Sequence, residues 1–199
     1  IEEAYEALEE STRATVGREY IGKTFQVGPS EIILSPEEAK KCALMYWKAL
    51  EFSETVDRHL REKRGDSYDF EISIDETTAP TLPAHHLFIA KELARRDVTV
   101  NSLAPRFIGE FQKGIDYIGD IQAFEEQFKV HCDIARANGN YKISIHSGSD
   151  KFSVYPIIGT HTDRRVHLKT AGTSWLEAVR SVTVSDPGLY RKIHEKAFQ

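Results

Sequence analysis

The chain repeats one strand-to-helix design, and this repetition constrains its fold more than any other feature. The clearest copy is the segment 141–153, whose sequence is YKISIHSGSDKFS. Read as a strand, it turns Ile143 and Ile145 to one face and Ser144 and His146 to the other. A surface strand of an antiparallel sheet shows the same alternation. A parallel sheet is favoured because the design recurs along the chain, each time with polar residues where a strand ends.

The other copies have the same alternation of strands and helices. The expected strands cover 68–75, 98–103 and 165–169, and the expected helices cover 84–96, 120–137 and two segments that begin at 174 and 187. Strands that are separated by helices pair in parallel, because a parallel connection needs a crossover. Residues 149–158 are left open between a short helix and a loop.

Two folds contain consecutive units of this kind: a doubly wound sheet and a (β/α)8 barrel. Strands of a doubly wound sheet are buried on both faces and tend to be continuously apolar. Here one face of each strand is aliphatic and the other is polar, which fits a barrel with outer helices and a site in its interior. The sequence therefore predicts an α/β fold of the TIM-barrel type, to which the chain contributes about four β/α units. Four units are half of eight, so we expect a partial barrel.

A different pattern precedes these units. Residues 1–34 are predicted to form a leading segment with a short helix and a hairpin, before the β/α units of residues 35–199. Ser35 is placed to cap a helix that has Pro36 at its first position, and Gly65 is placed to end it.

The composition restricts the class of protein. Of the 199 residues, 40% are hydrophobic and 29% are charged, as in soluble globular proteins. The net charge of -5 argues against a nucleic-acid partner, and no apolar run is long enough to span a membrane. The two cysteines, Cys42 and Cys132, indicate buried thiols in a reducing cytoplasm.

Candidate functional residues lie where the predicted strands end, because ligands of parallel α/β folds bind at that edge. They are Asp75 and Glu76; Arg106 and Glu110; His146, Ser149, Asp150 and Lys151; and His167, Lys169 and Thr170. Lys142 shares the polar face of its strand with His146. Carboxylates with an imidazole suit a divalent metal ion. Lysine and arginine beside hydroxyl groups suit a sugar acid.

Each candidate also has a structural interpretation, and spacing alone does not choose between the two. His146 is equally compatible with a hydrogen-bonded structural histidine. Glu76 is compatible with a loop cap, and Glu110 with an exposed loop residue. Arg106 is compatible with a scaffold ion pair to Asp75. The pair His85-His86 is expected to be structural or to support the site residues from behind.

Four long collinear motifs carry a resemblance to a known family. They read YDFEISIDETTAPTLPAHHLFIAKEL, LAPRFIGEFQKGIDYIGD, YKISIHSGSDKFSVYP and HLKTAGTSWLEAVR. From about residue 32 to the end, the chain resembles the tagaturonate epimerases (tagaturonate/fructuronate epimerases).

This resemblance implies a divalent-metal-dependent epimerase of hexuronate catabolism on a TIM-barrel-like scaffold. It implies that Glu76 is the catalytic acid/base and that Glu110 and His146 bind a cation of the Mn, Ni, Zn, Fe or Co class. We take the remaining candidates as substrate-binding residues: Asp75, Arg106, Lys142, Ser149, Asp150, Lys151, His167, Lys169 and Thr170. Family members are longer, and their earlier half is expected to supply a second base and a further metal-binding histidine. The expected partners are therefore a sugar acid and either that missing half or a second copy of the chain.

The expected chemistry is a reversible retro-aldol cleavage. The two uronates differ at a carbon one position beyond the carbon alpha to the ketone, so simple enolisation cannot invert it. The chain also lacks a glycine-rich dinucleotide motif after any predicted strand, which weakens a transient-oxidation route. Two alternatives stay open: a metal-dependent aldolase or ketose isomerase of the same barrel type, and a non-catalytic half-barrel.

Overall fold

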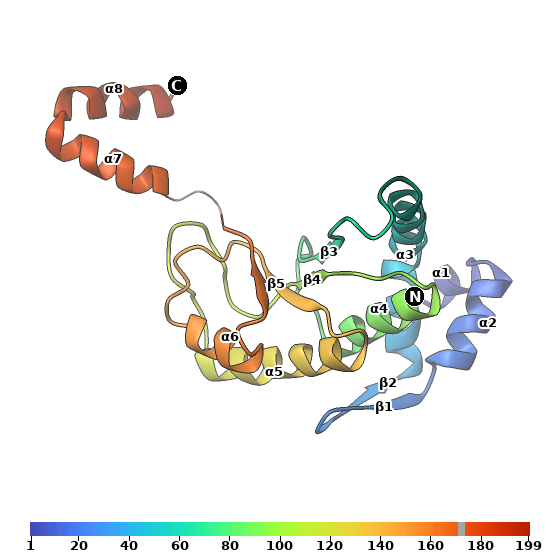
Figure 1. The fold of residues 1–199 in the computed structure, drawn as a ribbon. Coiled ribbons are helices and arrows are strands. Elements are labelled where there is room, and N and C mark those ends of the chain that lie inside the picture. Colours follow the sequence, from blue (N-terminus) through green and yellow to red (C-terminus); the bar gives the residue numbers. More distant parts are fainter. Residues whose placement is uncertain (171–173) are drawn as a thin grey trace.

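A parallel sheet of four strands forms the centre of the computed structural model, which describes residues 1–170 and 174–199. The strands follow one another across the sheet in the order β3 (Glu71–Ile74), β4 (Ser102–Pro105), β5 (Lys142–Ile145) and β6 (Val166–Leu168). All three neighbouring pairs are parallel (Figure 1). The predicted parallel pairing is confirmed.

Three helices make the crossovers between these strands: α4 (Pro83–Arg95), α5 (Ile121–Ala137) and α6 (Tyr155–His161). Helices α4 and α5 pack against each other and run along the same side of the sheet (Figure 1). The aliphatic strand residues Leu103, Ile143 and Ile145 belong to the core that these helices cover. The opposite face of the sheet carries the polar residues, as the alternation predicted.

The boundaries of the second strand differ from the prediction of 98–103. Pairing with β3 starts at Ser102, opposite Glu71, so β4 lies some residues later. Val98 and Val100 are buried before the strand begins. Their apolar side chains produced the strand-like pattern. Such a pattern indicates which side chains are buried, and it does not show where backbone pairing begins.

The leading segment contains more helix than predicted. It comprises α1 (Glu2–Glu6), α2 (Glu10–Glu19) and a hairpin of β1 (Lys23–Val27) and β2 (Ser30–Leu34). The predicted hairpin is therefore present. Residues 20–21, which resemble a strand in sequence, follow the end of α2.

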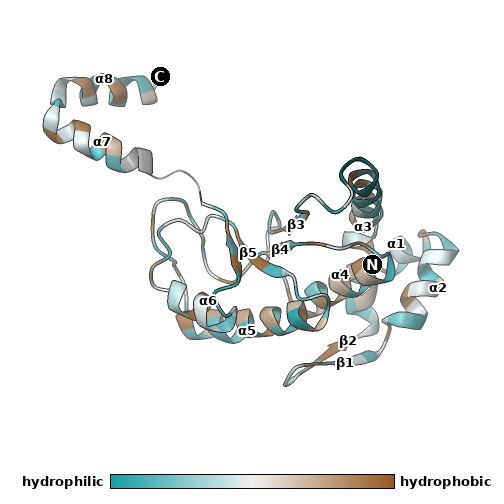
Figure 2. Ribbon diagram, in the orientation of Figure 1, coloured by the Kyte–Doolittle hydropathy of each residue, from teal (hydrophilic) through white to brown (hydrophobic). Residues whose placement is uncertain are grey.

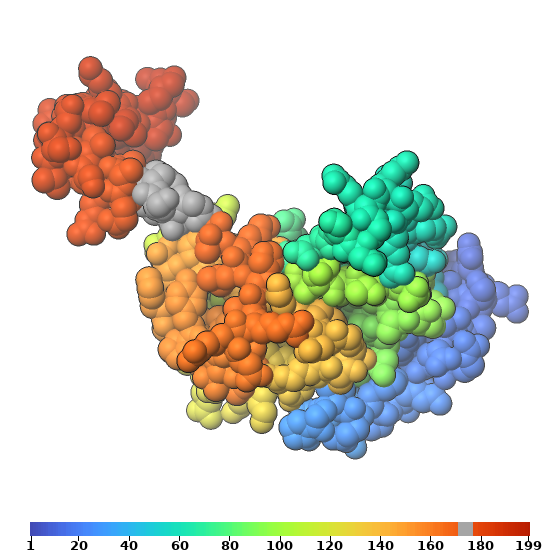
Figure 3. Space-filling view, in the orientation of Figure 1, coloured from blue at the N-terminus to red at the C-terminus, as the bar shows by residue number. Residues whose placement is uncertain are grey.

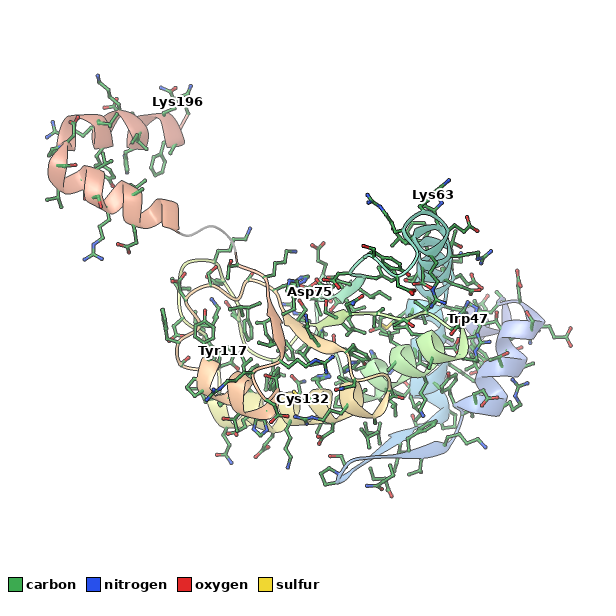
Figure 4. All side chains as sticks on the ribbon, viewed as in Figure 1. Trp47, Lys63, Asp75, Tyr117, Cys132 and Lys196 are labelled. Atoms are coloured by element: carbon green, nitrogen blue, oxygen red, sulfur yellow. The ribbon has the colours of Figure 1, made fainter. Side chains whose placement is uncertain are left out.

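The long helix α3 (Pro36–Arg64) begins and ends as the sequence predicts. The Ser35 side chain accepts a hydrogen bond from the amide of Glu38 at 3.2 Å. Gly65 ends the helix with a φ of 57°, a conformation that glycine adopts at little cost. The part of α3 around Lys63 is strongly hydrophilic, as Figure 2 and the labelled side chain in Figure 4 show.

Buried polar contacts join the leading segment and α3 to the β/α units. Glu92 of α4 is fully buried and accepts a hydrogen bond from Tyr20 at 2.7 Å while pairing with Arg95 and Arg96. His85 of α4 lies 2.6 Å from Glu38 of α3. The expected structural role of His85 agrees with this helix-to-helix contact.

The last two helices, α7 (Ser174–Ser185) and α8 (Pro187–Ala197), pack against each other. Asp186 caps α8 through a hydrogen bond from the amide of Leu189 at 2.9 Å. The pair is set apart from the rest of the molecule (Figure 3). Residues 171–173, between the candidate Thr170 and the helix predicted to begin at 174, lie outside the described residues. In the part of the chain that the structure describes, no helix combines the length and apolarity that a membrane crossing needs.

Candidate active site

A pocket of about 270 Å³ opens at the carboxyl ends of β3, β4 and β5. Its walls combine charged and aromatic side chains: Asp75, Pro105, Arg106, Phe107, Gly109, Glu110, Phe111, Gln112, His146 and Ser147. Four predicted site residues therefore share one cavity, namely Asp75, Arg106, Glu110 and His146. Figure 4 labels Asp75 where β3 ends and Tyr117 in the loop after β4.

His146 lies between two carboxylates that come from the two ends of β3. Its Nδ1 atom is 2.9 Å from Oδ2 of Asp75, and its Nε2 atom is 2.7 Å from Oε1 of Glu71. The histidine side chain is only 12% exposed. A ring nitrogen with a bare lone pair would repel a carboxylate oxygen at this distance, so each of the two contacts needs a shared proton or a cation.

Glu71 holds several groups besides His146. Its Oε2 atom accepts a hydrogen bond from Ser102 Oγ at 2.5 Å and lies 2.5 Å from Nδ1 of His167. Ser144 in turn contacts His167 at 2.9 Å. Burial raises the pKa of Glu71, but the hydrogen bonds from Ser102, His146, His167 and Ser144 outweigh it and lower the pKa to about 2. Glu71 is therefore an anion at neutral pH.

Glu110 is positioned by a folded loop between β4 and α5. Its backbone forms an isolated antiparallel bridge to Ile118, with an amide-to-carbonyl distance of 2.8 Å. The ring of Tyr117 fills the space beside Gly109, where an added Cβ would lie 2.4 Å from the tyrosine oxygen. Since Gly109 also has a φ of +76°, only glycine fits this position without strain. The exposed Glu110 carboxylate accepts a hydrogen bond from Gln112.

Lys151 ties this loop to the segment that follows β5. The lysine is fully buried, and its Nζ atom donates to the carbonyl oxygens of Gln112 and Ile115, each at 2.6 Å, and of Ser149 at 2.8 Å. Three acceptors use all three donors of the ammonium group. We predicted a substrate contact for Lys151, and in this structure its donors are engaged by the protein backbone.

Arg106 contacts the loop that carries Glu76. Its guanidinium donates to the carbonyl oxygen of Thr77, and its backbone exchanges hydrogen bonds with Thr81. This contact differs from the scaffold ion pair with Asp75 that the sequence left open. Glu76 is exposed in that loop, directly after the pocket residue Asp75, and does not line the cavity itself.

The remaining candidates are spread over the polar face of the sheet and its rim. Lys142 and His167 line a second cavity, beside Glu71 and toward the start of the strands. Ser149 is buried and Asp150 is half-buried in the turn after β5. Lys169 and Thr170 are exposed beyond β6. The structure thus separates these residues from the pocket that contains His146.

The donor set of the pocket is compatible in part with a divalent metal ion. An imidazole and two carboxylates line the same cavity, and the Asp75–His146 pair is already in contact. Within residues 1–170 and 174–199, no three metal-binding side chains converge on one point. The described residues therefore supply a pair of adjacent donors, with Glu110 as the nearest further candidate in the cavity.

Sequence reasoning missed Glu71 as a site residue. The alternation in the segment 68–75 places Glu71 on the same face as Asp75, but inside the strand and away from the carboxyl end, where ligands are expected. The signal that would have identified Glu71 is a carboxylate inside a strand, on the polar face, where an unpaired charge is costly.

These features define the class of protein: a parallel α/β protein with consecutive strand order and a carboxylate–imidazole pocket at the strand ends. The model of the tagaturonate epimerase family matches residues 1–199, and the chain belongs to this family. It is 45% identical over 193 residues to the tagaturonate/fructuronate epimerase of Thermotoga maritima, covering 96% of this chain and 40% of that protein.

Solved structures give the same result. The glycerol-complexed crystal structure of the fructuronate-tagaturonate epimerase UxaE from Cohnella laeviribosi superposes with a TM-score of 0.94 at 50% identity. The native crystal structure of that enzyme gives 0.91 at 51% identity. Each match covers 99% of this chain and 40% of the crystallised chain. The chain thus spans about two fifths of the length of these relatives.

Proposed function

We propose that this chain forms part of a divalent-metal-dependent epimerase that interconverts D-tagaturonate and D-fructuronate. The observation that supports this most is the pocket that Asp75, Glu110 and His146 line together, in a chain of the tagaturonate epimerase family. The relatives that match it are named for this reaction.

We propose a TIM-barrel-like scaffold for the complete fold. The strand order β3-β4-β5-β6 has no reversal, whereas a doubly wound sheet reverses its order at the ligand site. Helices α4 and α5 cover one side, and the polar face on the other side corresponds to a barrel interior.

Asp75, which the sequence assigned to the substrate, is here assigned to the metal ion because it contacts His146. His146 and Asp75 would hold the ion, with Glu110 as the third donor from this chain. When bound, a divalent cation supplies Lewis-acid stabilisation of negative charge on the substrate. The arginine Arg106, which lines the same cavity, offers a fixed positive charge for a sugar carboxylate.

Glu76 is the proposed acid/base. Its carboxylate takes the proton of the hydroxyl group on the carbon that is inverted, and that oxygen becomes the carbonyl of an aldehyde as the adjacent carbon–carbon bond breaks. The bonding electrons move to the ketone-bearing fragment, which becomes an enediolate. After the aldehyde rotates to its other face, the bond forms again and the acid returns the proton.

The variant Glu76→Gln tests this assignment in a full-length chain that carries these 199 residues. Because an amide cannot take the proton, we expect epimerisation to fall by at least about 100-fold while the bound metal stays unchanged. Metal content by mass spectrometry and turnover by substrate NMR give the two readouts. Glu62→Gln, an exposed change on α3, serves as the control. Retained turnover, or loss of metal in the Glu76 variant, would refute the role.

A further inference from the structure

We propose that Glu71 is a positioning residue that fixes which nitrogen of His146 faces the pocket. The proposal rests on the metal site of the preceding section and adds a residue that this site does not yet include. Glu71 holds Nε2, so Nδ1 is presented beside Asp75 to a divalent cation.

The contacts of His146 determine this orientation. Nε2 points toward Glu71 at 2.7 Å, inside the polar face of the sheet. Nδ1 points toward Asp75 at 2.9 Å, and Asp75 lines the same cavity as Glu110. Glu71 does not line that cavity. The imidazole therefore separates an inner carboxylate from an outer one.

Glu71 is itself held in place by two other strands. Ser102 of β4 donates to its Oε2 atom, and His167 of β6 approaches the same oxygen at 2.5 Å. These contacts leave Oε1 directed at His146 of the segment after β5. A carboxylate fixed by neighbours in this way can act as a rigid acceptor for the Nε2 proton.

The physical effect of such a carboxylate is known in general terms. A metal-binding histidine usually donates its second ring proton to an outer acceptor, which selects the tautomer and makes the other nitrogen a stronger donor. Loss of that acceptor typically weakens metal binding by about 10- to 100-fold. Asp75 is then the carboxylate on the Nδ1 side of His146, where the metal ion would bind. Glu71 is the carboxylate on the Nε2 side.

The first measurement is a titration with zinc chloride alone, followed by calorimetry, on a full-length chain that carries these 199 residues and on two variants of it. We expect Glu71→Gln to weaken zinc binding by about 10- to 100-fold, because the amide no longer holds the Nε2 proton as a charged acceptor does. The matched control is Asp69→Asn, an exposed carboxylate two residues earlier, which we expect to leave the affinity unchanged. Equal affinities of the Glu71 variant and the unmodified chain would overturn the proposal.

The second measurement needs no variant and stays decisive if the Glu71 change prevents folding. Nitrogen-15 NMR of the zinc-loaded unmodified chain should show His146 with a proton on Nε2 and zinc on Nδ1. The reverse assignment, with zinc on Nε2 and the proton on Nδ1, would overturn the role of Glu71, although His146 would still be a zinc ligand. Zinc bound elsewhere, or not at all, would instead overturn the metal site and this inference with it.

Discussion

His131 lies in a buried polar cluster between α4 and α5. Its Nδ1 atom is 2.8 Å from Nδ1 of His86, and Nε2 of His86 is 2.7 Å from the hydroxyl of Tyr141. Burial lowers the pKa of His131 to about 4, and burial together with the neighbouring His131 lowers the pKa of His86. Both rings are therefore neutral in the folded protein at pH 7.

The cluster should make stability depend on pH. Below the ordinary histidine pKa of 6.5 the unfolded chain binds protons that the folded chain excludes, so the free energy of unfolding falls as pH falls toward 4. Each such histidine contributes a slope of up to about 1.4 kcal/mol per pH unit. Replacing His131 by Phe should reduce the loss of stability between pH 7 and pH 5.

Urea unfolding at the two pH values measures this effect. His59→Gln, at an exposed position of α3, should leave the pH dependence of the unmodified chain intact. If the His131 variant loses as much stability on acidification as the unmodified chain, His131 is not a buried neutral group.

At the scale of single residues, sequence patterns identify a face but not a contact. The alternation predicted that His146 and Asp75 are both on the polar side of the sheet, and they do meet. It did not reveal that Glu71 reaches Nε2 of the same ring. That contact depends on the relative heights of β3 and β5, which are separated by β4 and set by pairing across the whole sheet.

At the scale of elements, the two loops around the pocket are joined by the buried Lys151 and by the exposed Asp116. Lys151 joins the segment after β5 to the loop that carries Glu110, and Asp116 of that loop accepts hydrogen bonds from Ser153. Burial lowers the pKa of Lys151, while the charges of Asp150 and Asp116 oppose the shift. The position of Glu110 thus depends on a lysine some forty residues away in sequence.

Lys151→Met should loosen this connection. Methionine keeps the apolar stem but leaves the carbonyl oxygens of Gln112 and Ile115 without their donor, which costs roughly 1–3 kcal/mol. We expect faster hydrogen exchange at the amides of Glu110 and Ile118, whose bridge depends on the loop. Lys113→Met, an exposed change in the same loop, is the control. Unchanged exchange in the Lys151 variant would show that the loop holds its shape without the ammonium group.

Helix starts were predictable and the start of β4 was not, for a physical reason. Ser35, Asp120 and Asp186 each cap a helix through hydrogen bonds to amides within three residues, so the signal is local. The start of β4 at Ser102 depends instead on pairing with β3, about thirty residues earlier. Loop contacts such as those of Lys151 have the same long-range origin.

At the scale of the whole molecule, β3 and β6 each have one partner in the four-stranded sheet. The polar face of this sheet carries Glu71, His146 and His167. The crossover helices α4 and α5 lie on the other side of the sheet (Figure 1). In the barrel that we propose, further strands would close over this face. The helices α7 and α8 follow β6 at the C-terminal end of the chain.

The central claim is that parallel strands bring Asp75, Glu110 and His146 to one pocket that binds a divalent cation. Anomalous diffraction from crystals soaked with manganese chloride tests it most directly. The account predicts one strong anomalous peak in this pocket, within bonding distance of His146 Nδ1 and an Asp75 oxygen. A peak on the Glu71 side of the ring, or manganese bound only outside the pocket, would contradict it.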